Sequence, residues 1–184
     1  MRVIAGKYRR TTLYTLQGKS TRPTADRIKE TLFNIINDDV YESDFLDLFA
    51  GSGQIGIEAL SRYASSVTFV DSKRESADCI NANLERCHTP ENAEVICGNA
   101  INTLKRFPDN SFDIIFMDPP YKSGYEEDIL KFLSESDVIR DNGLVITEAD
   151  INNDFTYTKS LNFELVQDKK YKNNRHLILR KTHK

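Results

Sequence analysis

The stretch Asp118–Tyr121, with the sequence Asp-Pro-Pro-Tyr, offers the most specific chemistry in this chain. It follows the apolar run 114–117, which is typical of a buried strand, and two prolines end a strand because they cannot donate to a sheet ladder. Both prolines fix φ near about −65°, so the stretch predicts a rigid ledge. A planar amino group attached to a ring needs such a ledge, with acceptors for its two N–H bonds and a flat face for stacking. The plain alternative is a Pro-Pro turn without chemistry. The predicted catalytic residues are therefore Asp118, Pro119, Pro120 and Tyr121.

A second pattern, Gly51-Ser52-Gly53-Gln54-Ile55-Gly56, follows the strand predicted at 45–49 and opens a helix. This is G-x-G-x-x-G, which is shared by many nucleotide-binding folds and is weak when it stands alone. Gly51 and Gly53 let a ligand approach the backbone, and Gly56 permits close packing of the helix.

Acidic and amide side chains follow the next strands at the same edge. Asp71 ends the second predicted strand, where a carboxylate accepts hydrogen bonds from ribose hydroxyls, although a helix cap is the simpler role. Asn99 follows the third strand, where its amide could read an adenine edge or serve an ordinary turn. The predicted cofactor-binding residues are Asp47, Phe49, Ala50, Gly51, Ser52, Gly53, Asp71, Ser72, Asn99, Ala100 and Asp118.

The aspartates at the predicted sheet edge also favour S-adenosylmethionine over NAD as the cofactor. NAD carries a pyrophosphate and needs donors or cations, whereas S-adenosylmethionine has no phosphate and carries a sulfonium and an amino group. A pocket ringed by Asp47, Asp71 and Asp118 favours the cation. Dinucleotide binding also leaves the proline ledge unexplained. The sequence therefore predicts S-adenosylmethionine rather than NAD, for which an oxidoreductase is the alternative.

Composition sets the class of protein. With 184 residues, 39% hydrophobic and 29% charged, the chain suits one globular domain. Its start is too charged for a signal peptide and no apolar run approaches the roughly 20 residues of a membrane span, so a cytoplasmic protein is expected. Cys79, Cys87 and Cys97 form no disulfide framework, and Cys87-His88 has no second close pair, so no metal site is predicted.

Charge is distributed unevenly along the chain. The net charge is −3, yet residues 1–30 hold eight Lys/Arg against two Asp/Glu, and residues 168–184 hold seven against one. Basic ends suit contacts with phosphates, although solvated terminal charge is the simpler explanation. We favour nucleic-acid binding because the centre of the chain resembles a base-modifying site.

Strand and helix patterns alternate between residues 45 and 148, which predicts a parallel sheet with helices on both faces. A terminal β-hairpin closes the sheet edge around the turn signal Lys172-Asn173-Asn174. Predicted strands are 45–49, 67–70, 94–97, 112–117, 143–148, 163–167 and 175–180; predicted helices are 25–37, 55–62, 75–87, 100–107 and 126–134. Residues 2–16 alternate weakly and predict a small N-terminal β-hairpin, so we divide the chain into an extension, 1–20, and a main domain, 21–184. The loop 152–157 carries no functional signal.

Three longer motifs resemble a known family. They are Arg2-Val3-Ile4-Ala5-Gly6-Lys7-Tyr8-Arg9, then Arg22–Asn34 with its Arg-Pro-Thr start, and the cofactor loop followed by Gly56-Ile57-Glu58-Ala59-Leu60-Ser61-Arg62. Together with the ledge they cover most of the chain and resemble the RsmD family. Its members are class I S-adenosylmethionine-dependent enzymes that methylate the exocyclic N2 amine of a guanine in bacterial 16S ribosomal RNA.

The resemblance implies a Rossmann-like class I methyltransferase fold with a seven-stranded, mostly parallel sheet. It implies 16S ribosomal RNA or a small ribosomal subunit particle as partner, and no membrane. The family usually has Gly at position 10, often Glu at 71 and commonly Asp at 99. The resemblance and the basic N-terminus together give the predicted RNA-binding residues Arg2, Lys7, Arg9, Arg10, Arg22 and Arg27, of which Arg22 and Arg27 could instead touch the cofactor's carboxylate. Deletion of residues 1–18 is expected to weaken RNA binding and to spare cofactor binding.

Other functions remain open from the residues alone. The same ledge suits methylation of adenine N6, cytosine N4 or a protein glutamine, and a non-catalytic RNA-binding assembly factor is a further alternative. A DNA enzyme usually carries a target-recognition insertion, and no connection in this chain is long enough for one. A protein methyltransferase would not need basic ends.

Overall fold

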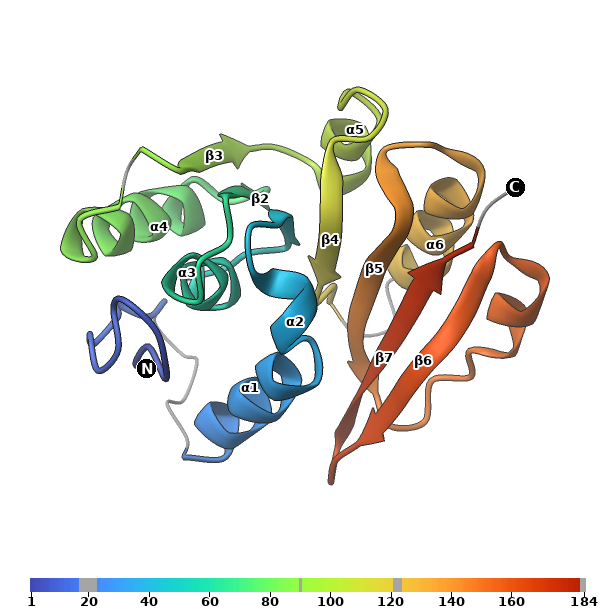
Figure 1. Cartoon of the computed structure of the whole chain (residues 1–184), viewed down its shortest axis with the longest axis horizontal. Helices are drawn as coiled ribbons and strands as arrows, with labels where there is room; N and C mark the ends of the chain where they lie inside the picture. Colours follow the sequence, from blue (N-terminus) through green and yellow to red (C-terminus); the bar gives the residue numbers. More distant parts are fainter. Residues whose placement is uncertain (17–22, 90, 121–123, 183–184) are drawn as a thin grey trace.

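Short apolar segments build a central sheet of seven strands (Figure 1). The computed structural model describes residues 1–16, 23–89, 91–120 and 124–182. The strands are β1 (Asp44–Leu48), β2 (Ser66–Asp71), β3 (Ala93–Cys97), β4 (Phe112–Met117), β5 (Ile139–Asp150), β6 (Phe163–Lys170) and β7 (Asn174–Lys181). Strands β1 to β5 pair in parallel, whereas β7 is antiparallel to both β5 and β6. The predicted α/β class, with a mostly parallel seven-stranded sheet, is confirmed.

The order of the strands fixes where a ligand can bind. It runs β3-β2-β1-β4-β5-β7-β6, so the chain reverses direction across the sheet between β1 and β4. Ligands of open α/β sheets bind at such a switch point, outside the carboxyl ends of the strands. Leu48 pairs with Met117 in this register, which places the residues that follow β1 and β4 side by side.

Helices cover both faces because the buried strands carry apolar residues on both. The helical segments are α1 (Pro23–Ile35), α2 (Asn37–Val40), α3 (Gln54–Ser61), α4 (Arg74–Arg86), α5 (Ala100–Leu104), α6 (Tyr125–Glu135) and the 3₁₀ turn η1 (Thr156–Ser160). Phe45 and Ile114 pack into one core cluster with residues of α1, α3 and α4. The alternate residues Leu46 and Ile115 pack into a second cluster with α5 and α6. No helix among the described residues is long and apolar enough to span a membrane.

Some predicted boundaries were wrong. The helix expected at 25–37 ends at Ile35, and the separate turn α2 contains the two aspartates that were expected to end it. Strand β5 begins at Ile139 rather than 143, because Ile139 pairs with Phe112 before a bulge interrupts the register. The 152–157 region leads into η1 instead of remaining a plain loop.

The N-terminal segment, residues 1–16, folds back on itself but forms no regular pair of strands. Its one antiparallel bridge joins Arg2 and Thr12. Backbone bonds still join its two halves, since the Val3 N–H donates to Thr11 O and the Leu13 N–H donates to Met1 O. The Ile4 and Ala5 N–H groups donate to the Glu58 carboxylate of α3 instead. The side chains of Val3 and Leu13 lie in the core cluster of the α1–α3–α4 face. The boundary predicted at residue 20 lies outside the described residues.

Candidate active site at the carboxyl edge of the sheet

The ledge stands where the sequence predicts it. Strand β4 is central and buried, and it ends at Met117. Asp118 follows, half-buried, with Pro119 buried and Pro120 exposed. Tyr121 lies outside the described residues. Because Asp118 directly follows Met117, the last residue of a strand paired on both sides, the sheet sets its position.

The loop after β1 lies beside the ledge. The Ala50 N–H donates to Val70 O at 3.0 Å, which ties the loop to β2. Gly51 adopts φ 58°, in the left-handed region that favours glycine. Gly56 lies so close to β2 that an added Cβ would stand 2.3 Å from the Phe69 ring, so the predicted close packing of the helix is confirmed.

Asp47 is the buried acid of the site. It is 1% exposed and accepts a hydrogen bond from the Gly56 N–H at 2.9 Å. The pKa of Asp47 is raised to about 7, chiefly because burial penalises the charged form; the Gly56 bond lowers this pKa, and the nearby Asp118 and Asp71 contribute to its rise. A cation in the pocket would favour the ionised form.

One pocket gathers about half of the predicted cofactor residues. Its lining includes Asp47, Phe49, Ala50, Gly51, Ser52 and Asp118. Gly53, Asp71, Ser72, Asn99 and Ala100 are not part of that lining. Gly53 is buried and caps α3, and Ala100 is buried at the start of α5.

Asp71 and Asn99 have structural partners. The Asp71 carboxylate accepts hydrogen bonds from the Gly51 N–H and the Lys73 N–H, both at 2.9 Å. It therefore braces the loop after β1. The Asn99 Oδ1 accepts from the Asn102 N–H at 3.1 Å and caps α5. Because the Asn99 oxygen is used in this cap, the Asn99 Nδ2 group is the part of the side chain that could contact a ligand. Ser72 is exposed beside Asp71.

Sequence reasoning missed one wall of the pocket. Met1, Thr15 and Leu16 from the N-terminal segment line it, together with Gln54, Ile55 and Phe116. No local pattern marks these residues, because their place depends on how the segment returns to the sheet. We therefore expect deletion of residues 1–18 to weaken cofactor binding as well as RNA binding, contrary to the expectation from the sequence.

Asn83 of α4 joins that wall to the loop after β1. It is fully buried. Its Oδ1 accepts from the Tyr14 N–H at 2.7 Å, and its Nδ2 donates to Tyr14 O at 3.1 Å and to Ser52 O at 2.9 Å. One amide thus positions both sides of the pocket.

A buried charged cluster, formed by Lys29, Glu58 and Arg62, anchors the rest of the N-terminal segment. Glu58 is fully buried, and its oxygens lie 3.1 Å from Lys29 Nζ and 3.0 Å from Arg62 Nε. Lys29 is 3% exposed and also donates to Arg2 O at 2.8 Å. Burial lowers the pKa of Lys29, and the Glu58 carboxylate opposes that effect. These contacts give a structural role to the motif Gly56–Arg62, which the sequence marked as distinctive.

Four of the six predicted RNA-binding residues share a groove between the N-terminal segment and α1. Arg2, Arg9, Arg10 and Arg27 line it with Asp26 and Glu30, and Arg2 pairs with Asp26 at 3.2 Å. Lys7 lies apart, with its Nζ 5.2 Å from the centre of the Tyr63 ring. Arg22 lies outside the described residues. Arg10 has φ 72°, a strained value for arginine.

No group of three or more His, Cys, Asp or Glu side chains suited to a metal ion occurs among residues 1–16, 23–89, 91–120 and 124–182.

Comparison with known proteins decides the family. The family model described as "Conserved hypothetical protein 95" matches residues 1–180. The Haemophilus influenzae protein named ribosomal RNA small subunit methyltransferase D is 40% identical over 154 residues, which is 82% of this chain and 79% of that protein. This chain belongs to the RsmD family. The Escherichia coli protein of the same name is 36% identical to this RsmD-family chain over 155 residues, covering 83% and 76% of the two.

Solved structures agree with the family. The structure titled "Putative methyltransferase yhhF from Escherichia coli" has a TM-score of 0.89 and 30% identity, covering 100% of this RsmD-family chain and 99% of that one. The putative methylase HI0767 from Haemophilus influenzae has a TM-score of 0.84, also at 30% identity, covering 99% and 98%. The predicted class I methyltransferase fold is therefore confirmed.

Proposed function

We propose that this protein transfers a methyl group from S-adenosylmethionine to the exocyclic N2 amine of a guanine in 16S ribosomal RNA. The observation that carries the proposal is the lining of a single pocket by Asp118 of the ledge and by the loop after β1. A methyl acceptor held on the ledge would therefore face a cofactor held by the loop. The relatives named ribosomal RNA small subunit methyltransferase D support ribosomal RNA as the substrate.

The donor set of this pocket fits S-adenosylmethionine. Two carboxylates, Asp47 and Asp118, line it, and the described lining holds no Lys or Arg. Such a site favours a sulfonium and an ammonium group and disfavours a pyrophosphate. Backbone groups of 50–52 would hold the cofactor's main body, Asp71 its ribose, and the Asn99 amide its adenine edge. When bound, the cofactor supplies a methyl group already activated by positive sulfur.

The ledge has to orient a poor nucleophile, because the lone pair of guanine N2 is delocalised into the ring. The Asp118 carboxylate and the Pro119 carbonyl accept the two N–H bonds of the amine, which pyramidalises the nitrogen and aims its lone pair. Tyr121 stacks on the base, which is splayed out of its RNA context. Orientation of this kind can lower a barrier by about 7–11 kcal/mol. Asp118 then holds the proton that becomes acidic after transfer, so it need not be a strong base.

The pKa of Asp47 predicts a pH-dependent cost of folding. An acid whose pKa rises to about 7 on folding, from 3.8, binds its proton more tightly in the folded state, so stability falls as pH rises from about 4 through 7. We expect Asp47→Asn to stabilise the free protein at pH 8 by on the order of 2–4 kcal/mol and to have little effect at pH 4. Denaturant unfolding at the two pH values measures this difference.

The same variant should bind S-adenosylmethionine more weakly, because a charge partner of the cation is lost. Calorimetry near pH 6.5, in buffers of different ionisation enthalpy, should detect proton release on binding to the wild type and none with Asp47→Asn. Equal stabilisation at pH 4 and pH 8 would contradict the buried-acid account.

The groove between the N-terminal segment and α1, lined by Arg2, Arg9, Arg10 and Arg27 and called here the arginine groove, supplies the contact with RNA phosphates. We expect Arg10→Gly to stabilise the fold by about 1 kcal/mol, because glycine adopts positive φ without strain. It should also weaken RNA binding and lower the salt dependence of the affinity by about one unit of slope, since one phosphate contact is lost. Filter binding at several salt concentrations measures the RNA affinity and its salt dependence. Denaturant unfolding measures the change in stability.

The matched control for Arg10→Gly is Arg106→Gly, which removes an exposed arginine just after α5, outside the groove. An equal loss of affinity in the two variants would show that net charge, rather than the groove, attracts the RNA.

Mass spectrometry of nucleosides tests the proposed reaction. Small-subunit RNA and partly assembled particles are incubated with the protein and S-adenosylmethionine and then digested. We expect N2-methylguanosine to appear only when the protein is present. Methylated adenine or cytosine would move the assignment to another amine, and no methylated nucleoside would favour an assembly factor without catalysis.

A further inference from the structure

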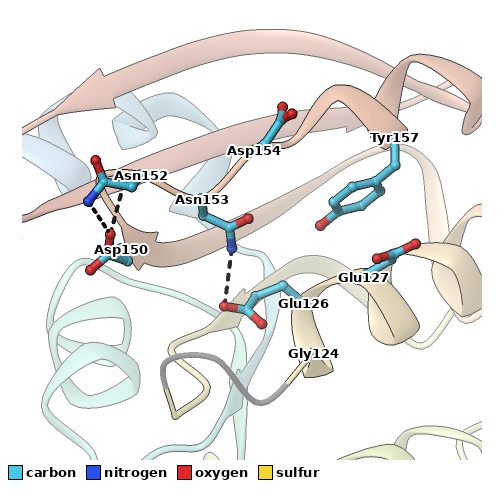
Figure 2. Close-up of a pocket in the computed structure, with 8 residues that line it drawn as sticks. All are labelled: Gly124, Glu126, Glu127, Asp150, Asn152, Asn153, Asp154 and Tyr157. Atoms are coloured by element: carbon cyan, nitrogen blue, oxygen red, sulfur yellow. Dashed lines mark hydrogen bonds between the residues drawn. The ribbon is translucent and has the colours of Figure 1, made fainter.

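A second pocket, larger than the first, opens between the start of α6 and the segment that follows β5 (Figure 2). Its volume is about 420 Å³. The side chains that matter for its chemistry are Glu126, Glu127, Asp150, Asp154, Asn153 and Tyr157. None of them was predicted as a site residue, and the region 152–157 carried no signal in the sequence.

The pocket belongs to the same edge of the sheet as the ledge. Strand β5 is the neighbour of β4, with Thr147 paired to Met117, and Asp150 lies three residues further toward the carboxyl end. Helix α6 begins at Tyr125, soon after the ledge along the chain. A base whose amine rests on the ledge can therefore extend toward this pocket.

Glu126 is a buried carboxylate, and few hydrogen bonds or ion pairs offset the cost of its burial. It is 4% exposed, and among the described residues its one hydrogen bond comes from Asn153 Nδ2 at 3.5 Å, the outer limit for such a bond (Figure 2). None of the ion pairs among the described residues involves it. A carboxylate this deeply buried is costly unless strong donors reach it, and a ligand with N–H groups would provide them.

Tyr157 adds a second unsatisfied group. Its hydroxyl is buried and has no hydrogen-bond partner within the part of the chain that the structure describes, and Figure 2 shows it pointing into the pocket on the side of Glu126 and Glu127. Burial raises the pKa of Tyr157, and the two glutamates raise it further. The hydroxyl therefore keeps its proton and can donate, while the ring offers an apolar face.

Charge selects the kind of ligand. Four carboxylates line the pocket, and the described lining residues include no Lys or Arg. Phosphate is repelled by such a lining, so the RNA backbone must pass elsewhere, whereas a ligand edge rich in N–H donors is attracted. Guanine presents N1–H and N2–H₂ on its Watson–Crick edge, whereas adenine presents an acceptor at N1. A carboxylate therefore accepts from guanine and repels the N1 lone pair of adenine.

We propose that this pocket receives the target guanine and that the Glu126 carboxylate accepts its N1–H, so that Glu126 determines the specificity for guanine. The inference rests on the proposed function, because the amine on the ledge is taken to be N2 of the same base. The Tyr157 ring packs against the base, and the Tyr157 hydroxyl donates a hydrogen bond to the base oxygen O6. Flipped bases are commonly read in this way, through the Watson–Crick edge and an aromatic side chain.

The analogue 2,6-diaminopurine tests the role of Glu126. It keeps the N2 amine but has an acceptor at N1 in place of N1–H and an amino group in place of O6, so the contact proposed for Tyr157 changes as well, and the Glu126→Gln variant separates the part that belongs to N1. The two bases are placed in turn at the methylated position of a small-subunit RNA, and kcat/KM for methyl transfer is measured. The wild type should prefer guanine by roughly 100-fold or more, as sites built to hydrogen-bond one substrate do.

Glu126→Gln should reduce that preference to about tenfold or less, because its amide can donate to N1 of the analogue. The matched control is Asp128→Asn, an exposed carboxylate in the same first turn of α6 and outside the pocket. It should keep the wild-type preference. A wild-type preference in Glu126→Gln would overturn the inference and leave the proposed function standing, whereas wild-type protein that methylates neither base would overturn both.

Tyr157→Phe provides an independent check if Glu126→Gln fails to bind S-adenosylmethionine and is therefore misfolded. Removal of the hydroxyl should lower kcat/KM for the guanine RNA about tenfold while cofactor affinity stays at the wild-type value. An unchanged kcat/KM would contradict the placement of the base in this pocket.

Discussion

Replacement of Asp118 by alanine should reduce the rate of methyl transfer by at least about a thousandfold, whereas the affinity for S-adenosylmethionine should fall far less, through the loss of one of the two carboxylates that line the pocket. Asp118 accepts an N–H bond of the target amine in the proposed mechanism, and without it the lone pair is no longer aimed at the methyl group. The loss should appear in kcat rather than in KM, because orientation acts on the transition state. Single-turnover transfer of a labelled methyl group, together with calorimetry of cofactor binding, measures both quantities.

Asp118→Asn is the conservative companion variant. Its amide oxygen can still accept one hydrogen bond, although without the charge, so its activity should lie between wild type and Asp118→Ala. A wild-type rate in Asp118→Ala would refute the ledge mechanism. Equal loss of rate and of cofactor affinity would make Asp118 a binding residue instead.

Replacement of Glu58 by alanine should destabilise the protein by about 3–5 kcal/mol, since it leaves a buried cation without its carboxylate. Lys29 would lose its partner, and the Ile4 and Ala5 N–H groups would lose their acceptor. The N-terminal segment should then detach, which opens the arginine groove and removes one wall of the cofactor pocket. Denaturant unfolding measures the stability, and RNA and cofactor affinities report the release.

The control for Glu58→Ala is Asp78→Ala, which breaks the exposed pair of Asp78 with Arg74 on α4. An exposed pair contributes at most about 1 kcal/mol, so this variant should behave as wild type. If Glu58→Ala were as mild as Asp78→Ala, the anchoring role of the buried charged cluster would be wrong.

Local patterns were sufficient for the centre of the fold. The central strands β1 and β4 are short, largely apolar runs, and the loop after β1 and the ledge follow them directly, so their place at one edge followed from the rule for parallel sheets. The pairing of Leu48 with Met117 then brings Asp118 beside the loop, as predicted. The role of Gly56 was also predicted correctly, because close packing of a helix against a strand requires glycine at a single position, which can be recognised in the sequence.

Residues whose role depends on distant contacts were not predictable. Met1 and Leu16 line the cofactor pocket because the N-terminal segment is held against α3 and α4. Asn83 of α4 binds Tyr14, 69 residues away in the sequence. Glu58 of α3 binds Ile4, 54 residues away. The expected hairpin forms only in part: backbone bonds such as Val3 N–H to Thr11 O join its halves, while the Ile4 and Ala5 N–H groups bond to a side chain of the main domain.

Three features at the sheet edge were not decided by composition. The position of Asn99 after a strand left open whether it reads an adenine edge or serves a turn, and the structure shows that its Oδ1 caps α5. The polar stretch 152–157 had no recognisable pattern, because a pocket is formed from two chain segments and neither one contains the whole signal. Glu126 likewise looks in the sequence like an ordinary first-turn acid of a helix.

A crystal structure of the protein with S-adenosylmethionine bound would show where the methyl donor lies relative to the ledge. We expect the cofactor in the pocket lined by Asp47, Gly51 and Asp118, with its methyl carbon facing the ledge and about 3–3.5 Å from where a nitrogen held by Asp118 and Pro119 would lie. A cofactor bound in another pocket, or with its methyl group directed away from the ledge, would contradict the account.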